Sequence, residues 1–299
     1  MIIQIPGKTF LLGEYAVLQG GPALIATTKP YFQLKINSDN KVAMPFHADS
    51  PAGRFIHDHA FESTHLEWFS PYLQGGFGGS TAEFLACYYY QMKRTSPSLL
   101  LNQLNLTHLY QTYLLYAYNG IGIPPSGADL VAQTQSSIVY FEPQKILKTE
   151  ENNRQKQETL SLINWPFSEL SLLFFKTAYK LPTHQYLTSF QSPNDLPDFS
   201  DLSELTHQGY TALKEMNAHR FIESINDYAF TLQGLNLTVD STKDLIKKLR
   251  KHSACFATKG CGALGADVIV AIVDSTQEKD FLMASKHYPL SLIATHRDL

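Results

Sequence analysis

Three glycine-rich segments of the chain carry the charged and hydroxyl side chains that are best placed for chemistry. The first segment, residues 6–24, contains Lys8 and Glu14. The second, residues 75–82, runs into an apolar stretch, and the third, residues 259–267, begins with a lysine and ends with an aspartate. A glycine-rich loop that opens a helix offers unpaired N–H groups and the positive end of the helix dipole, so it binds anions. These segments are therefore candidate anion-binding sites.

Two common nucleotide-binding fingerprints are missing from these segments. No glycine run is followed by Gly-Lys-Ser/Thr, so the chain has no Walker A motif. The loop at 75–82 follows no convincing βαβ strand, so it does not match the dinucleotide-binding fingerprint. Each glycine-rich turn taken alone is a weak signal, so the assignment of function depends on the order of the motifs along the chain.

That order resembles a known family across nearly the whole chain. Pro-Gly-Lys and Gly-Glu-Tyr-Ala-Val-Leu come first, followed by Gly-Ser-Thr-Ala at 79–82, Pro-Ser-Gly-Ala-Asp at 125–129 and Lys-x-x-Gly-Ala-x-Gly-x-Asp at 259–267. This succession looks like the GHMP kinases, which include the galactose, homoserine, mevalonate and phosphomevalonate kinases. The resemblance implies ATP-dependent phosphoryl transfer to a small molecule, with ATP and Mg²⁺ as cofactors.

The resemblance also implies a role for each candidate residue. Lys8 would neutralise charge on the transferring phosphoryl group, and Asp129 would orient or deprotonate the attacking oxygen. Ser80 or Thr81 would face Mg²⁺. The implied cofactor-binding residues are Gly75, Gly76, Gly78, Gly79, Ser80 and Thr81. The implied substrate-binding residues are Glu14, Tyr15, Ser126, Gly127, Lys180, Thr183 and Gly262.

The chain departs from the family pattern in its glycine-rich turns. Phe77 and Gly78 stand where the family has a glycine and a leucine, and Phe77 would be strained if its φ were positive. Leu264 and Ala266 stand where the family prefers glycine. These changes keep open a catalytically degenerate protein of GHMP fold that binds a metabolite without turnover.

Other departures bear on the branch of the family. Tyr15 replaces a histidine that is usual in mevalonate kinases, and Asp267 follows the third turn much as in phosphomevalonate kinases. Residues 109–120 contain no carboxylate, whereas mevalonate kinases supply a magnesium-binding glutamate there. These features favour phosphomevalonate kinase; mevalonate kinase and a diphosphomevalonate decarboxylase-like enzyme are the alternatives.

Some candidates also have a simpler interpretation. Asp129 can cap a turn or helix after Ser126 and Gly127. Ser80 and Glu83 have the spacing of a capping box, in which case Thr81 is the better magnesium ligand. Lys180 and Thr183 can bind an anionic group of the substrate. An ordinary strand-to-helix loop without a binding role is at least as good an interpretation of this segment.

Local patterns predict the elements that position these residues. Residues 2–5 are predicted as a strand broken by Pro6-Gly7, 32–36 as a strand, and 37–73 mostly as loop. A helix is expected to begin near Ser80. Further helices are predicted at 102–118, 201–219, 220–234, 240–252 and 276–287, and further strands at 136–142, 170–176, 254–260, 266–273 and 290–295.

The composition of the chain limits the remaining classes of function and cellular setting. The chain has 299 residues, 44% of them hydrophobic, and a formal net charge of −3, so it offers no basic surface typical of nucleic-acid binding. No run of about eighteen apolar residues predicts a membrane span, and three scattered cysteines indicate a reducing, cytoplasmic setting. The expected partner is a small anionic metabolite, for a monomer or homodimer.

The expected fold is an α+β, GHMP kinase-like two-domain architecture. By the resemblance, residues 1–160 form an ATP-binding domain like ribosomal protein S5 domain 2, and residues 161–299 form a ferredoxin-like domain. The polar window at 144–159 suggests the boundary.

Overall fold

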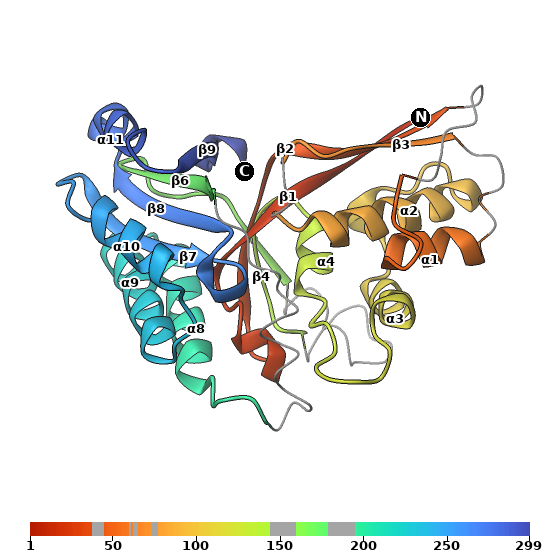
Figure 1. Ribbon diagram of the computed structural model, residues 1–299, viewed down its shortest axis with the longest axis horizontal. Helices are drawn as coiled ribbons and strands as arrows, with labels where there is room; N and C mark the ends of the chain where they lie inside the picture. Colours follow the sequence, from red (N-terminus) through yellow and green to blue (C-terminus); the bar gives the residue numbers. More distant parts are fainter. Residues whose placement is uncertain (38–44, 60, 62–64, 73–76, 144–159, 179–194) are drawn as a thin grey trace.

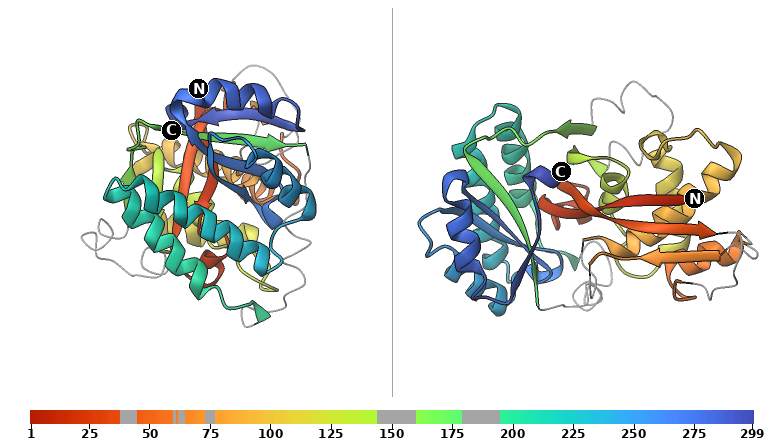
Figure 2. Two further views of the ribbon diagram at one scale, coloured as in Figure 1. Left: turned by 90° about the vertical axis from the view of Figure 1, so that its left-hand side faces the viewer. Right: turned by 90° about the horizontal axis from the view of Figure 1, so that it is seen from above.

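The chain forms two lobes, each built on an antiparallel sheet (Figure 1). The computed structural model describes residues 1–37, 45–59, 61, 65–72, 77–143, 160–178 and 195–299. The first two strands run through the middle of the molecule. The helices of the first lobe lie on one side of them, and the second lobe lies on the other (Figures 1 and 2). This mixture of helices and antiparallel sheets confirms the predicted α+β class.

Within the described residues, the first lobe is a five-stranded sheet covered by four helices. The strands pair in the order β1-β2-β4-β5, and β3 pairs with the outer half of β2. The strands are β1 (Ile2–Leu12), β2 (Ala23–Asn37), β3 (His65–Phe69), β4 (Ser137–Phe141) and β5 (Leu160–Ile163). The helices are α1 (Pro51–Asp58), α2 (Gly79–Thr95), α3 (Leu106–Ala117) and α4 (Ala128–Gln133), with short 3-10 turns η1 (Ala16–Gln19) and η2 (Leu101–Gln103).

The predicted strand break at Pro6-Gly7 is wrong. β1 continues through both residues, and its register with β2 shifts between Ile5 and Gly7. Such a bulge accommodates a proline, because a residue at a bulge need not donate to the ladder. Lys8 therefore lies within a long strand, and its neighbour across the sheet is Thr27.

The prediction of mostly loop for residues 37–73 is also wrong where the structure describes them. α1 and β3 both lie in this segment. α1 begins at Pro51, and the side chain of Ser50 caps it by accepting from the N–H of Gly53 at 3.0 Å. Ser-Pro is a strong helix start, and the weak periodicity of the residues around it hid this signal.

The second lobe has the ferredoxin-like arrangement that the sequence predicts. Its strands pair in the order β7-β8-β6-β9, and its chain order is strand, helices, two strands, helix, strand. The elements are β6 (Leu170–Thr177), α8 (Ser200–Lys214), α9 (Ala218–Gly234), α10 (Asp240–Leu249), β7 (Cys255–Cys261), η4 (Ala263–Gly265), β8 (Val268–Asp274), η5 (Ser275–Gln277), α11 (Glu278–Ser285), β9 (Leu290–Thr295) and η6 (His296–Asp298).

The predicted domain boundary at 160/161 falls inside a strand. β5 (Leu160–Ile163) pairs with β4, so it belongs to the first sheet. We propose that the division lies between β5 and β6 instead.

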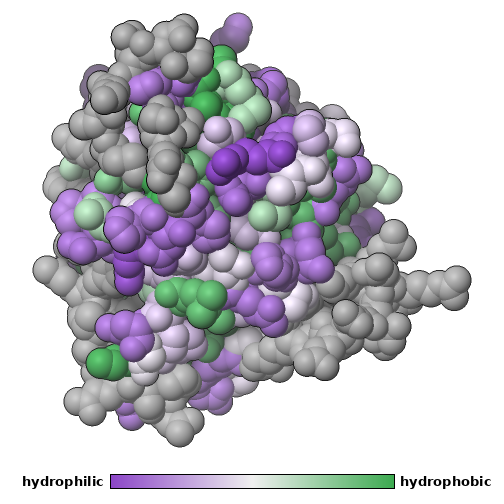
Figure 3. Space-filling model, turned by 90° about the vertical axis from the view of Figure 1, so that its right-hand side faces the viewer, coloured by the Kyte–Doolittle hydropathy of each residue, from purple (hydrophilic) through white to green (hydrophobic). Residues whose placement is uncertain are grey.

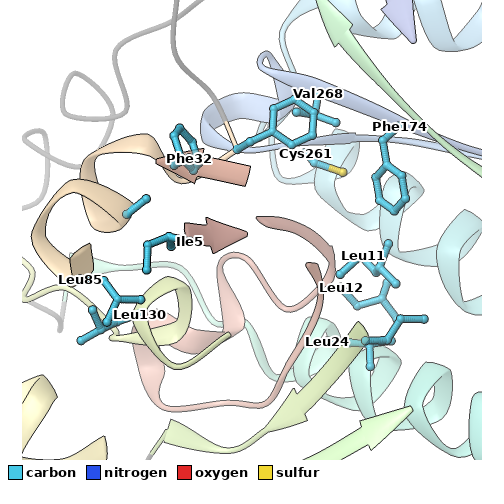
Figure 4. Close-up of a cluster of buried hydrophobic side chains, with 14 of the residues drawn as sticks. Ile5, Leu11, Leu12, Leu24, Phe32, Leu85, Leu130, Phe174, Cys261 and Val268 are labelled. Carbon is cyan, nitrogen blue, oxygen red and sulfur yellow. The ribbon is translucent and has the colours of Figure 1, made fainter. Parts of the chain in front are cut away.

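One continuous core joins the lobes. Phe174 of β6 lies in a buried cluster that also contains Ile5 of β1 and Leu85 of α2 (Figure 4). Leu172 of β6 belongs to the same cluster. The alternate residues of β6 face the other way, onto α10 and α11. β6 is therefore packed on both faces, and its inner face shares a core with β1, the strand that contains Lys8.

The outer face of the first lobe is mainly hydrophilic, with hydrophobic side chains in small separate patches (Figure 3). No helix in the described ranges is both long and apolar enough to cross a membrane.

Candidate active site

Lys8 and Asp129 meet at the centre of the first lobe. The Nζ atom of Lys8 lies 2.7 Å from Oδ1 of Asp129, with side chains that are 13% and 32% exposed. The ammonium group also lies 4.6 Å from the centroid of the Phe10 ring. The pair is thus confined on one side by protein and open to solvent on the other, as a group that meets a ligand must be.

The carboxylate of Asp129 is presented by the short helix α4. Gly127, with φ of 76°, is the residue that caps this helix, and the hydroxyl of Ser126 accepts from the N–H of Ala128 at 3.2 Å. Asp129 lies inside the first turn, so the interpretation of this residue as a helix cap is wrong. Tyr110 of α3 donates to the carbonyl of Pro125 at 2.8 Å, which fixes the loop that leads into α4.

The N-terminus of α2 lies against Lys8. The helix begins at Gly79, and no side chain caps it. Gly78 has φ of 80°, and a Cβ placed there would be 2.8 Å from Cγ of Lys8, so the contact requires glycine. The N–H of Lys8 donates to the carbonyl of Phe77 at 2.9 Å. An ammonium group beside an uncapped helix N-terminus makes a site for an anion.

Phe77 has the positive φ that its position implied, at 54°. Its ring is buried and stacks on Tyr72, with ring centroids 4.4 Å apart. The hydroxyl of Tyr72 donates to the carbonyl of Pro30 at 2.6 Å. The phenylalanine therefore anchors the loop to β2, and this packing offsets the cost of the left-handed backbone.

Comparison with known proteins identifies the fold. Streptococcus pneumoniae phosphomevalonate kinase in complex with phosphomevalonate and AMPPNP superposes with a TM-score of 0.73 at 19% identity, over 99% of each chain. Methanococcus jannaschii mevalonate kinase gives 0.71 at 14% identity, over 99% of this chain and 97% of that one. Lactococcus lactis galactokinase complexed with galactose gives 0.69 at 12% identity, over 97% and 92%.

The chain has the GHMP kinase fold. No family model matches its sequence, and no curated protein matches it either. The fold is therefore recognisable in the structure and in the order of a few motifs, while overall sequence similarity is low.

Within the GHMP kinase fold, the two candidate hydroxyls differ in access. Ser80 is exposed, whereas Thr81 is buried and hydrogen-bonded to Tyr113 of α3. The capping box predicted for Ser80 and Glu83 is wrong, because Gly78 is the N-cap and no side chain caps the helix. Ser80 is thus the better placed of the two for a metal ion, contrary to the expectation that followed from a capping role.

Glu83 lies half-buried one turn into α2. Burial raises the pKa of its carboxyl group to about 7. Carboxyl groups with such a pKa change charge near neutral pH, so this residue makes the α2 N-terminal region sensitive to pH.

Sequence reasoning missed two supporting residues. Burial and, to a smaller extent, the negative charge of Asp129 together raise the pKa of the Tyr113 phenol to about 12, so the phenol stays protonated at neutral pH. Gln133 is fully buried on α4 and donates to the carbonyl of Pro6 at 2.8 Å, which ties α4 to β1. Neither residue belongs to a recognisable motif. The only signal in the sequence is the residue type, a tyrosine on α3 and a glutamine on α4.

The third glycine-rich turn lies where β7 meets β8. Gly262 has φ of 87°, and a Cβ there would be 3.0 Å from Oδ2 of Asp267. Leu264 has a positive φ of 51°, which the family pattern of glycine at this position would ease. This turn is close-packed, so we interpret its side chains as stabilising the conformation of the turn rather than as contacting a ligand.

Two predicted substrate-binding residues have partners inside the protein. Glu14 forms a buried ion pair with Lys259, and the hydroxyl of Tyr15 accepts from the N–H of Leu264. Both side chains thus have partners within the protein, and the substrate contacts that the resemblance implied for Glu14 and Tyr15 stay predictions.

The remaining predicted site residues fall outside the described ranges. They are Gly75, Gly76, Lys180 and Thr183. In the part of the chain that is described, no group of three or more His, Cys, Asp or Glu side chains could hold a metal ion by itself.

Proposed function

We propose that the chain is an ATP-dependent phosphotransferase of the GHMP kinase type that acts on a small anionic metabolite. The observation that carries this proposal is the ion pair of Lys8 and Asp129 beside the uncapped N-terminus of α2. A cation, a carboxylate and free helix N–H groups at one point are the parts that phosphoryl transfer needs, because its catalysis is mainly positioning and charge stabilisation.

The proposed roles follow from the geometry of the pair. Asp129 orients the attacking oxygen of the acceptor and, where that oxygen carries a proton, accepts it. Lys8 offsets negative charge on the phosphoryl group as its bond to ADP breaks and its bond to the acceptor oxygen forms. The N–H groups at the start of α2 hold the phosphates of ATP, next to Gly78 and Gly79.

The residues present fit a magnesium ion. Mg²⁺ in such sites is held by one or two protein oxygens together with substrate phosphates and water, and needs no closed protein cage. Ser80, which is exposed, and Asp129, which is partly exposed, would supply these oxygens. Bound there, the ion would neutralise phosphate charge.

Phosphomevalonate is the acceptor that we propose first, in the mevalonate route to isoprenoids. A phosphate acceptor is already ionised near neutral pH, because its second pKa is about 6, so it requires cations more than a general base. Tyr15, Asp267 and the lack of a carboxylate on α3 support this branch. The similar fold of a kinase solved with phosphomevalonate and AMPPNP supports it further. Mevalonate and, for a decarboxylase-like enzyme, diphosphomevalonate are the alternatives.

A protein that binds without turnover is the second candidate. The left-handed backbone at Phe77 and Leu264 favours it, because both residues replace the flexible glycines of the family pattern. We further propose a cytoplasmic monomer or homodimer.

A coupled assay of ADP release tests the function. Mevalonate, phosphomevalonate, diphosphomevalonate, homoserine and sugars are supplied in turn with Mg·ATP, and CO₂ is measured alongside. Turnover with phosphomevalonate alone supports the proposal, and CO₂ from diphosphomevalonate indicates the decarboxylase. Binding of AMPPNP without ADP release from any acceptor would establish the degenerate protein.

A further inference from the structure

A buried ion pair joins the two lobes through the first and third glycine-rich segments. Lys259 of β7 donates to Glu14, which follows β1, and the side chains are 1% and 5% exposed. The ammonium group also donates to the carbonyl of Gly260 at 3.1 Å and lies 5.3 Å from the centroid of the Tyr228 ring. Desolvation of two charges offsets most of their attraction, so such a pair is weak evidence for stability alone.

The Lys259 ammonium group stays charged although it is buried. Burial lowers its pKa, but the carboxylate of Glu14 raises it, and the result lies above the usual value. Burial also raises the pKa of the Cys261 thiol to about 11, so the thiol is neutral. The second oxygen of the Glu14 carboxylate, Oε2, has no hydrogen-bond partner in the described part of the chain. Lys259 thus holds Glu14 almost alone.

A second link between the lobes joins Tyr15, the residue after Glu14, to Leu264 in the middle of the third glycine-rich turn. The N–H of Leu264 donates to the hydroxyl of Tyr15 at 2.9 Å. Tyr15 is buried, and its ring packs on Phe199 with centroids 5.7 Å apart. The backbone of Leu264 is in the left-handed region, where few alternatives are accessible, so one hydrogen bond there fixes the course of the turn.

Both links start from the residues directly after the strand that carries Lys8. β1 ends at Leu12, and Glu14 and Tyr15 follow after Gly13, while the second lobe supplies Lys259 and Leu264. The third turn is therefore held to the same rigid strand as the proposed catalytic lysine, although β7 belongs to the other sheet.

We propose that Glu14 and Tyr15 are positioning residues that hold the third glycine turn in a fixed place relative to Lys8, and that this placement sets nucleotide affinity and turnover. The inference rests on the proposed phosphotransferase function for its kinetic part. Glu14 and Tyr15 touch no reacting atom; they act through Lys259 and Leu264.

Three variants separate positioning from stability. Tyr15→Phe removes the acceptor of the Leu264 N–H and keeps the ring. Glu14→Gln leaves the buried Lys259 uncompensated, and the double variant Glu14→Gln with Lys259→Met removes that charge again. Glu278→Gln is the matched control, because Glu278 is a buried carboxylate in an ion pair with Arg297, on α11 away from the site.

A thermal melt gives the Tm of each variant, and three further measurements are made well below that Tm. Hydrogen exchange follows the peptide that covers residues 259–267, titration calorimetry gives the Kd of Mg·AMPPNP, and the ADP-release assay gives kcat and KM. We expect Tyr15→Phe and Glu14→Gln to raise exchange in this peptide and to weaken AMPPNP binding by about fivefold or more, with kcat reduced. Glu278→Gln should lower Tm and leave exchange at 259–267, Kd and kcat unchanged.

The double variant decides between the two roles. Positioning predicts that Tm recovers while exchange, Kd and kcat stay altered, because the link to β1 is still missing. Recovery of all four quantities together would show that the pair is only structural and would overturn the inference. Should the natural protein turn over no acceptor, the proposed function fails, and unaltered exchange and AMPPNP binding in Tyr15→Phe would separately overturn the positioning role.

Discussion

At the scale of single residues, the sequence identifies the charged pair and misses what supports it. Lys8 and Asp129 lie in recognisable motifs, so their types and order predicted a shared site, and the structure brings them within 2.7 Å. Tyr113 and Gln133 belong to no motif, because their contacts depend on how α3 and α4 pack against β1 and α2. A side chain that acts through tertiary contacts leaves no pattern in its own neighbourhood.

The charged pair can be tested directly. Lys8→Met and Asp129→Asn should each lower kcat by about a hundredfold or more, because each removes charge stabilisation or orientation at the reacting centre. Both side chains are partly exposed, so thermal melts should remain close to those of the natural protein. Asp201→Asn is the matched control, since Asp201 lies in the first turn of α8 and is exposed. Near-normal kcat in both site variants would remove the proposed centre.

Glu83 predicts a pH dependence of stability. Its carboxyl pKa is about 7 in the folded protein and near the ordinary value of 4.5 when unfolded, so the folded state holds the proton more tightly. Stability from this group is complete below the unfolded pKa and is lost as pH rises through about 7. Glu83→Gln should therefore raise Tm relative to the natural protein at pH 8 and much less at pH 5. An equal effect at both pH values, or the same pH-dependent gain for the exposed Glu204→Gln on α8, would contradict this.

At the scale of elements, sustained hydrophobic patterns predict the helices of the second lobe correctly, whereas unusual backbone conformations are predicted only in part. The four predicted helices of the second lobe all appear, because their apolar spacing is sustained over ten or so residues. β1 was divided at Pro6-Gly7, since a bulge and a strand end carry the same residues and only the pairing with β2 tells them apart. Phe77 was correctly identified as a strained position, but its stacking on Tyr72 could not be seen in the sequence.

The two strained turn residues should respond differently to glycine. Phe77→Gly eases a left-handed backbone, worth about 1–2 kcal/mol, but it removes a buried ring, which costs about 3–5 kcal/mol. Leu264→Gly eases the same kind of strain and removes a side chain that is only partly buried. We expect Phe77→Gly to destabilise the protein clearly and Leu264→Gly to change the free energy of unfolding little. Denaturant titration measures both, and equal losses would contradict the balance of strain against burial.

At the scale of the whole molecule, the fold class and the ferredoxin-like half follow from the sequence, while the domain division does not. The polar window at 144–159 placed the boundary inside β5, because polarity marks a surface segment and says nothing of strand pairing. The large core contains residues of both lobes, and the buried pair of Glu14 and Lys259 crosses between them. Two lobes with a shared core and a shared ion pair should unfold together.

The two tryptophans provide a probe in each lobe for this last prediction. Trp68 on β3 stacks on Phe32 in the first lobe, with ring centroids 5.6 Å apart. Trp165 packs against Phe221 of α9 in the second, at 5.8 Å, and its indole N–H donates to the carbonyl of Leu170 at 2.9 Å. Trp68→Phe and Trp165→Phe each leave one reporter, so fluorescence follows one lobe at a time, while far-UV circular dichroism of the same samples follows the whole chain. We expect the fluorescence and dichroism transitions in urea to coincide within each variant, because a continuous core makes unfolding cooperative. Comparison within a variant cancels the stability change that the substitution itself causes. A fluorescence midpoint displaced from the dichroism midpoint in opposite directions in the two variants would show that the lobes unfold separately and that the shared core and ion pair do not couple them.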